Sequence, residues 1–365
     1  MRIPVVDTNN QPLMPTTPAR ARKWIEAGIA IKRWSACGQF YVQLVVEPSG
    51  RDSQDIVIGI DPGKKYSGIG VQSAKCTLYT AHLILPFQTV RQRMDLRRLM
   101  RRGRRGRRIN RKADFSKRAH RQKRFSNRRQ AKLAPSIRAN RQLELRIVKE
   151  LCEIYPVAEI RYEYVRADVD LTSGRKKARS GKGFSAVMVG QRWMLKQLEQ
   201  FATTVTIVGY QTASTRKHLC LEKNKKNKSE AEFHTHAIDG VAIAASHFVG
   251  YRKYHKLNQD GANWFGKVAI TPSLFFVIRR PPYSRRQLHL MVPSAGGLRR
   301  KYGGSTTRHG FRKGDLVNSP KGIGYVSGDT EKQISVSDTN WKRLGQISAR
   351  KMQLIRRSNG LIVRS

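Results

Sequence analysis

The segment at residues 91–132 is the feature that most limits how this chain can fold. It holds twenty Lys and Arg residues against two Asp residues, and apolar stretches flank it on both sides. Like charges four residues apart cost a helix several tenths of a kcal/mol per pair, and Gly103 and Gly106 each cost about 1 kcal/mol relative to Ala. We therefore expect a core built around this segment, and a long helix within it that is ordered when polyphosphate is bound.

The charge of the whole chain supports the same expectation. The 365 residues include 72 Lys and Arg against 25 Asp and Glu, which gives a formal net charge of +47. Self-repulsion on this scale calls for a polyanionic partner, and nucleic acid is the obvious one. No run of 18 apolar residues is present to span a membrane, and the start MRIPVVDTNN does not resemble a signal peptide. We expect a cytoplasmic nucleic-acid-binding protein without membrane contact.

Outside the basic segment, apolar periodicity predicts an α/β core. Runs at 56–61, 67–72 and 77–85 with short connectors predict three antiparallel strands. After the basic segment we expect a helix at 136–155, a strand at 157–165, a helix at 190–202, a strand at 203–209 and a helix at 232–249. This order matches a ribonuclease-H-like architecture, with the basic segment inserted after the third strand. Ahead of it we expect a helix at 19–27 and a strand at 40–47, and after it a small β-barrel module near the end.

Acidic residues are scarce, yet three of them lie inside apolar elements. Asp61 ends the strand IVIGID, Glu163 lies in the strand IRYEYV, and Asp239 lies on the last core helix. His236 lies three residues before Asp239, on the same helical face. Burying carboxylates is costly unless a cation compensates, and metal-dependent nucleases hold two Mg²⁺ ions about 3.5–4 Å apart with such groups.

Each of these residues also has an ordinary interpretation. Asp61 could be a turn residue, Glu163 could face solvent, and His236 and Asp239 could form a surface pair. Taken with the element order and the charge, we interpret Asp61, Glu163 and Asp239 as ligands of two Mg²⁺ ions. We further expect Gly63 to allow a nucleic-acid backbone to approach.

The arginines of the basic segment are predicted to contact phosphates, which positions nucleic acid without reading its sequence. The candidates are Arg97, Arg98, Arg101, Arg102, Arg104, Arg105, Arg107, Arg108, Arg111, Arg118, Arg121 and Arg124.

Several motifs together resemble the IscB/IsrB family, transposon-encoded relatives of the RNA-guided CRISPR nucleases. IGIDPGKKYSGIGV, IRYEYV and HTHAIDGVAIA resemble the three RuvC motifs, and the basic segment resembles the bridge helix. QPLMP resembles the motif that names the PLMP domain, and RRQLHLMVPSAGGLRRKYGGS, RKGDLV and GYVSG resemble the C-terminal module. The resemblance implies a PLMP domain at 1–55, the first RuvC segment at 56–90, a bridge helix at 91–133, the second and third RuvC segments at 134–250, and a C-terminal β-rich domain at 251–365 that interacts with a target-adjacent motif.

One departure distinguishes the two branches of this family. IscB proteins insert an HNH nuclease domain between the second and third RuvC motifs, whereas only about 70 residues separate Glu163 from His236 here. The chain therefore resembles IsrB, the branch without HNH. That resemblance implies a guide (omega) RNA, a target double-stranded DNA opened as an R-loop, and a nick in the non-target strand. Asp61, Glu163 and Asp239 match the metal ligands, and His236 matches the histidine that assists attack.

The C-terminal module is the candidate reader of the adjacent motif. Its candidate residues are Arg285, Arg286, Arg299, Arg300 and Lys301, for each of which a phosphate contact or a solvated charge is an equal alternative. Two other functions stay open: a Holliday-junction resolvase of the same superfamily, and an RNA-binding protein without activity. We expect a monomeric protein within a ribonucleoprotein.

Overall fold

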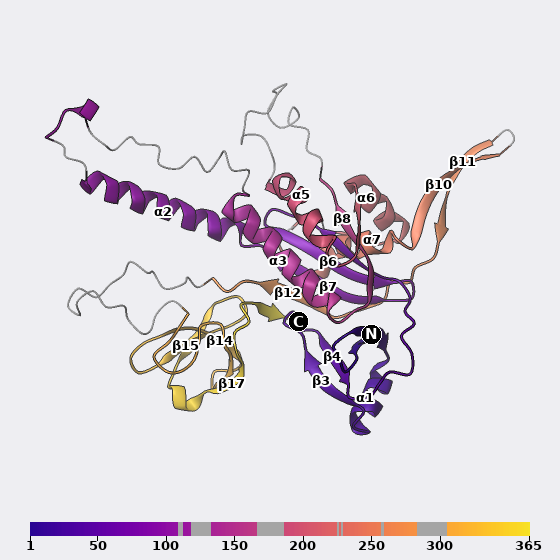
Figure 1. Cartoon of the computed structure of the whole chain (residues 1–365), viewed down its shortest axis with the longest axis horizontal. Coiled ribbons are helices and arrows are strands. Elements are labelled where there is room, and N and C mark those ends of the chain that lie inside the picture. Colours follow the sequence, from indigo (N-terminus) through magenta and orange to yellow (C-terminus); the bar gives the residue numbers. More distant parts are fainter. Residues whose placement is uncertain are drawn as a thin grey trace.

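The computed structural model describes residues 1–108, 112–117, 133–165, 186–224, 226–227, 229–256, 259–282 and 305–365. These residues form a central sheet covered by helices and two smaller β-rich units (Figure 1). Some predicted nucleic-acid contacts lie outside the described residues, namely Arg111, Arg118, Arg121, Arg124, Arg285, Arg286, Arg299, Arg300 and Lys301.

The central sheet contains the strands that the sequence predicts and two more. Its strands are β5 (Ile56–Asp61), β6 (Tyr66–Ser73), β7 (Thr77–Ile84), β8 (Val157–Glu163), β9 (Thr203–Ile207), β12 (Phe275–Arg279) and β18 (Ile362–Arg364). They lie in the order β18-β12-β7-β6-β5-β8-β9. β5, β6 and β7 are antiparallel neighbours, while β8 and β9 continue the sheet parallel to β5. Three antiparallel strands followed by two parallel ones is the expected ribonuclease-H-like order.

Side-chain alternation assigns the two faces of this sheet. Ile58 and Ile60 of β5 join the main core with Leu143 and Leu151 of α3 (Pro135–Cys152), so α3 covers their face. Met194 and Leu198 of α5 (Ala186–Leu198) belong to the same core. The opposite face of β5 carries the alternate residues, and α7 (Ile238–Ala245) packs there with α6 (Gly209–His218) beside it (Figure 1).

Glycines allow α7 to lie directly on the sheet. A Cβ built on Gly59 would lie 2.1 Å from the carbonyl oxygen of Gly240, and one built on Gly68 would lie 1.8 Å from that of His236. Side chains at these positions would force the helix away. All eight residues of α7 are buried, and the close approach places its first turn beside the end of β5.

The N-terminal unit is a four-stranded sheet with one helix. Its elements are β1 (Ile3–Val6), β2 (Pro12–Thr16), α1 (Pro18–Glu26), β3 (Ala30–Trp34) and β4 (Phe40–Leu44). Thr17 caps α1, because its hydroxyl accepts the backbone N–H of Arg20 at 3.3 Å, and Pro18 begins the helix. The unit has its own small core around Val5 and Val42.

The C-terminal unit is a five-stranded antiparallel sheet. It contains β13 (Leu316–Asn318), β14 (Gly324–Asp329), β15 (Ile334–Ser337), β16 (Arg343–Ile347) and β17 (Gln353–Arg356), around a core that includes Val326 and Val336. The range 251–365 is nevertheless not one separate unit, because β12 and β18 belong to the central sheet. Tyr325 of β14 joins the two sheets: its hydroxyl accepts from the N–H of Val363 and donates to the carbonyl of Val363, at 3.2 Å each.

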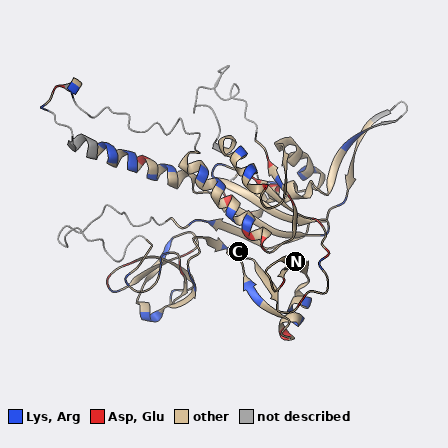
Figure 2. Cartoon of the chain, viewed as in Figure 1, with Lys and Arg blue, Asp and Glu red and all other residues tan. Residues whose placement is uncertain are grey.

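The basic segment begins as the helix α2 (Phe87–Arg108), which extends away from the central sheet and carries Arg along its length (Figures 1 and 2). Three apolar side chains on it, Leu96, Leu99 and Met100, are more than half exposed. The predicted helix is therefore present as far as Arg108, and a short 3₁₀ turn follows at Phe115–Lys117. Among the helices in the described parts of the chain, none combines the length and apolarity needed to cross a membrane.

Candidate active site

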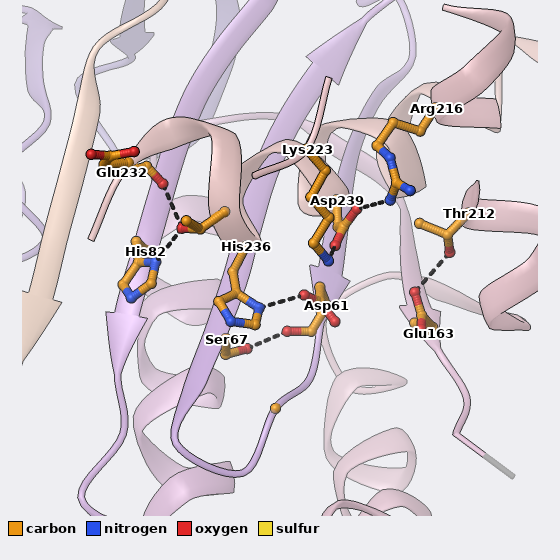
Figure 3. A network of polar contacts seen from close by, with 12 residues as sticks. Asp61, Ser67, His82, Glu163, Thr212, Arg216, Lys223, Glu232, His236 and Asp239 are labelled. Atoms are coloured by element: carbon orange, nitrogen blue, oxygen red, sulfur yellow. Dashed lines mark hydrogen bonds and ion pairs between the residues drawn. The ribbon is translucent and has the colours of Figure 1, made fainter. Parts of the chain in front are cut away.

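Asp61 lies at the end of β5, on the face that α7 covers. The Oδ2 atom of Asp61 lies 2.9 Å from Nδ1 of His236 (Figure 3). The backbone carbonyl of Asp61 accepts a hydrogen bond from the hydroxyl of Ser67 at 2.7 Å, which ties β5 to β6 beyond the last ladder pair. Two residues that the sequence places 175 positions apart are thus in direct contact.

Glu163 ends β8, the parallel neighbour of β5, and is two residues beyond Arg161 on the same face. The hydroxyl of Thr212 on α6 donates to Oε2 of Glu163 at 2.8 Å (Figure 3). Burial, and then the negative charges of Asp61 and Asp239, raise the pKa of Glu163 to about 7. Glu163 therefore does not face open solvent but is part of an acidic cluster.

Asp239 lies in the first turn of α7 and is buried. Its two carboxylate oxygens pair with Arg216 of α6 and with Lys223, which follows that helix (Figure 3). Burial and the charge of Asp61 raise the pKa of Asp239, while Lys223 and Arg216 act in the opposite direction. Two basic side chains thus balance the carboxylate where a metal ion is expected.

His236 comes from a π-helical turn, Phe233–Ala237, that runs into α7. Such turns widen a helix by one residue and occur often at functional sites. The ring of His236 contacts those of Tyr66 and His82, with centroids 5.8 and 5.5 Å away, and these two rings contact each other at 5.2 Å. This ring contact fixes the side chain that faces Asp61.

His82 on β7 is a site residue that the sequence did not reveal. It is fully buried, and burial followed by the charge of His236 lowers the pKa of His82 to about 4, so the ring is neutral at pH 7. Its Nδ1 lies 3.2 Å from the hydroxyl of Thr235, and that hydroxyl donates to the carbonyl of Glu232 at 2.7 Å. Because a hydroxyl has one proton to donate, Nδ1 of His82 is the donor to Thr235.

The loop after Asp61 is held by α3 on the other side of the sheet. Arg141 donates to the carbonyl of Gly63 at 2.9 Å, and Asn140 donates to the carbonyl of Lys64 at 2.9 Å. Arg141 is buried and is paired with the buried Glu144 at 3.0 Å. A Cβ on Gly63 would lie 1.7 Å from the carbonyl oxygen of Tyr66, so the loop itself requires glycine, whatever approaches it from outside.

The three carboxylates fit magnesium by their donor chemistry. They are oxygen ligands, and burial together with their mutual repulsion raises the pKa of Glu163 and Asp239, a cost that a divalent cation relieves. Among the described residues, however, no three His, Cys, Asp or Glu side chains stand close enough to share one ion as arranged. The pairing of Asp239 with Arg216 and Lys223 supplies a physical reason, because it turns both oxygens of Asp239 to protein cations.

The partners on α6 were also missed from the sequence. Thr212 and Arg216 lie on GYQTASTRKH, a polar stretch with no apolar periodicity to mark it as a helix. Of the predicted nucleic-acid contacts on α2, the structure describes exposed side chains at Arg97, Arg98, Arg101 and Arg102. For Arg104, Arg105, Arg107 and Arg108 it describes the helical backbone alone.

Comparison with known proteins gives one family match. A family model described as "RRXRR protein" matches residues 3–183, just under half of the chain, a range that includes Asp61, α2 and Glu163. The pattern of two arginine pairs around one residue occurs in α2 at 101–105 and again at 104–108. A search of the curated proteins found no match.

Two solved structures show a weaker similarity. RuvC of Thermus thermophilus in complex with a Holliday junction substrate is 13% identical, with 53% of this chain and 92% of that chain covered and a TM-score of 0.27. A CRISPR-Cas12f ternary complex is 14% identical, with 62% and 47% covered and a TM-score of 0.32. Similarities at these TM-scores are too weak to carry an inference about this chain.

Proposed function

We propose that this protein is a Mg²⁺-dependent RuvC-type endonuclease that nicks one strand of a DNA target selected by a guide RNA. The observation that carries the proposal is the convergence of Asp61, Glu163 and Asp239 from three elements on one face of a ribonuclease-H-like sheet. Burial first, and then the charge of Asp61, raises the pKa of both other carboxylates, which is consistent with one shared electrostatic site. His236, in contact with Asp61, completes the set.

In this function Asp61, Glu163 and Asp239 would hold the metal. When bound, magnesium would neutralise charge on the phosphate and activate water for hydrolysis of the phosphodiester bond. Thr212 fixes the orientation of Glu163. Because Nδ1 of His236 faces Asp61, Nε2 is the nitrogen that could contact a phosphate oxygen or accept a proton from water.

Arg216 and Lys223 have a second role in the same proposal. Both side chains now pair with the oxygens of Asp239. If Asp239 held a metal ion, their charge would be available beside the centre for the scissile phosphate, where a basic pair would stabilise the charge that develops during attack.

The number of centres supports nicking over double-strand cutting. Between Glu163 and His236 the described residues form α5, β9 and α6, all of which belong to the central domain. A second nuclease domain does not fit into what is left of this interval. One centre cuts one strand at a time.

The selection of the target by RNA is supported by charge and by family. α2 places a dense row of arginine on an exposed helix, which suits binding to backbone phosphates and to base-paired guides. The matched family is found in IscB/IsrB-like proteins. The partners that we propose are accordingly a guide (omega) RNA and a target DNA opened as an R-loop, in a ribonucleoprotein with one protein chain.

The test is a nicking assay on supercoiled plasmid with the RNA that co-purifies with the protein. We expect Mg²⁺-dependent relaxation of a plasmid that carries the matching target, and a loss of about a hundredfold or more in rate for Asp61→Ala, the scale on which removing a key stabilising group acts. RNA binding should be unchanged in that variant. Nicking by Asp61→Ala at the rate of the parent protein would contradict the proposed active site. Cutting of a four-way junction without RNA would indicate a junction resolvase instead.

A further inference from the structure

A groove of about 880 Å³ lies between α6 and the hairpin formed by β10 (Val249–Lys256) and β11 (Gln259–Gly266). The hairpin extends outward from the central sheet beside α6 and α7 (Figure 1). None of the contacts assigned to the carboxylates above involves the hairpin. The groove is therefore a second surface of the central domain.

Aromatic rings line this groove. His218 of α6 stacks on Trp264 of the hairpin, with ring centroids 4.1 Å apart and planes within 3°. Tyr251 is the cross-strand partner of Trp264, with centroids 5.5 Å apart, yet it is 59% exposed. Arg252 and Phe265, whose guanidinium and ring centre are 4.1 Å apart, lie on the opposite face of the hairpin, because side chains alternate along each strand. Exposed aromatic rings grouped in this way are shielded from water on binding a flat apolar surface, and a nucleobase offers such a surface.

The charge of the groove selects the same class of ligand. Its described lining includes Arg161, Lys217 and Arg252 and no acidic residue. Arg161 donates to the backbone carbonyl and the hydroxyl of Ser246, at 2.8 and 2.9 Å, and also pairs with Glu159 at 2.5 Å, so its charge is already partly balanced. Lys217, which is exposed, is therefore the main cation beside the rings. Aromatic faces together with cationic groups are the combination by which proteins bind single-stranded nucleic acid, since bases stack on the rings while phosphates meet the cations.

Two elements, β8 and α6, contribute residues both to the groove and to the candidate active site. Arg161, on the groove side, and Glu163 lie two residues apart on the same face of β8, which is about 7 Å along a strand. On α6, Thr212 and Arg216 contact the catalytic carboxylates, whereas Lys217 and His218 line the groove. A strand held in the groove is therefore held within one or two nucleotides of the carboxylates.

We propose that this groove binds the DNA strand to be cut as a single strand, with its bases on Trp264 and Tyr251 and its phosphates beside Lys217. The proposal rests on the proposed function, because it is the position next to the nuclease centre that identifies the bound strand as the substrate. Bases within a duplex are stacked on one another and cannot offer their faces to the rings, so the groove takes the strand after it is unpaired. The cut strand is then positioned by stacking, whichever bases it contains.

The experiment measures binding of fluorescein-labelled oligo(dT) by anisotropy, using the full protein with its guide RNA bound. We expect the double variant Tyr251→Ala/Trp264→Ala to bind about tenfold or more weakly, since each base stacked on an aromatic contributes on this scale. Trp34→Ala is the matched control, because Trp34 is an exposed ring of the N-terminal unit. The control should bind as the parent does.

A second measurement locates the bound strand. Oligo(dT) that carries 5-iodouracil should crosslink to the hairpin, and the crosslink should disappear in the double variant. Tyr210→Ala tests the same groove if the hairpin variant does not fold, because Tyr210 lines the groove from α6 and is 73% exposed. We expect a severalfold loss of affinity from this change.

Three outcomes would overturn the proposal: parent-like binding in both groove variants, crosslinks confined to other elements, or displacement of the labelled DNA from the groove by oligo(U) at lower concentration than by oligo(dT). These readouts do not require cutting. If the protein fails to nick plasmid but binds oligo(dT) through Trp264, only the proposed function is contradicted. If it nicks plasmid and the groove variants bind oligo(dT) as the parent does, only the proposal that the groove binds DNA is contradicted.

Discussion

Two helices of the central domain, α7 and α2, are opposites in composition and in surroundings. α7 has eight residues, all buried, with one carboxylate, and it lies against glycines of the sheet. α2 has 22 residues, and its described outer half is exposed and rich in arginine. The comparison indicates that α7 is stabilised by packing within the protein, whereas the outer part of α2 is free to contact a binding partner. Substitutions on the two sides should therefore affect different properties.

The largest effect is expected on the α7 side. Gly59→Ala would place a Cβ 2.1 Å from a backbone oxygen of α7, which cannot move aside as a side chain can. We expect the free energy of unfolding to fall by about 3 kcal/mol or more, the upper part of the range for overpacked cores. Thermal unfolding followed by circular dichroism measures it. A variant as stable as the parent would show that α7 is not in close contact with the sheet.

On α2, replacing Arg97, Arg98, Arg101 and Arg102 by Ala should leave stability within about 0.5 kcal/mol, because these side chains are exposed. Binding of the guide RNA should weaken, and the slope of log K against log[salt] should become shallower by about 0.7–0.9 for each phosphate that the protein no longer neutralises. Filter binding at several salt concentrations gives the slope. A lower melting temperature with an unchanged salt slope would show that these arginines stabilise the fold and do not contact phosphates.

An intermediate effect is expected from Lys223→Ala. Removing this side chain frees one oxygen of Asp239, so the protein should bind Mn²⁺, as a spectroscopic substitute for Mg²⁺, about tenfold more tightly, which corresponds to one charge-assisted hydrogen bond of about 1.4 kcal/mol. Electron paramagnetic resonance of free Mn²⁺ measures the affinity. Lys226→Ala, an exposed position in the same loop, is the control. Weaker Mn²⁺ binding by the Lys223 variant would show that the lysine does not compete with metal.

The smallest effect uses the same substitution as the largest. A Cβ on Gly103 meets no atom within 4 Å, so Gly103→Ala on α2 should stabilise the helix by up to about 1 kcal/mol. Hydrogen exchange of the α2 amides should slow accordingly. Glycine to alanine would then have opposite signs on the two helices, and faster exchange in this variant would contradict the assignment of α2 as an ordinary solvent-exposed helix.

The fold was predictable where it depends on local pattern. The alternating runs that became β5, β6, β7 and β8 indicated both the strands and their order, and the positions of Asp61 and Glu163 at strand ends followed from them. β12 and β18 could not be placed in the central sheet, because five-residue and three-residue strands acquire their partners only through distant contacts.

The candidate site was predictable in its acidic residues and not in its surroundings. His82 lies in an apolar strand, where its residue type alone suggests a core position, and its contacts come from Thr235 and His236 on another element. The stacking of His218 on Trp264 joins residues 46 positions apart in segments without a motif. The pairing of Asp239 with Lys223 joins residues 16 positions apart on different elements, so charge type alone could not reveal it.

The chain leaves the central sheet at β12 and returns to it at β18, and the Tyr325 hydroxyl is bonded to the returning strand. A module attached at both of its ends and bonded at its margin cannot rotate freely on a single linker. In the proposed function, any bases that this module contacts on a double helix would therefore stay at a fixed distance from the carboxylates. The central sheet, and not the RNA, would then decide how many base pairs lie between the contacted bases and the phosphodiester bond that is cut.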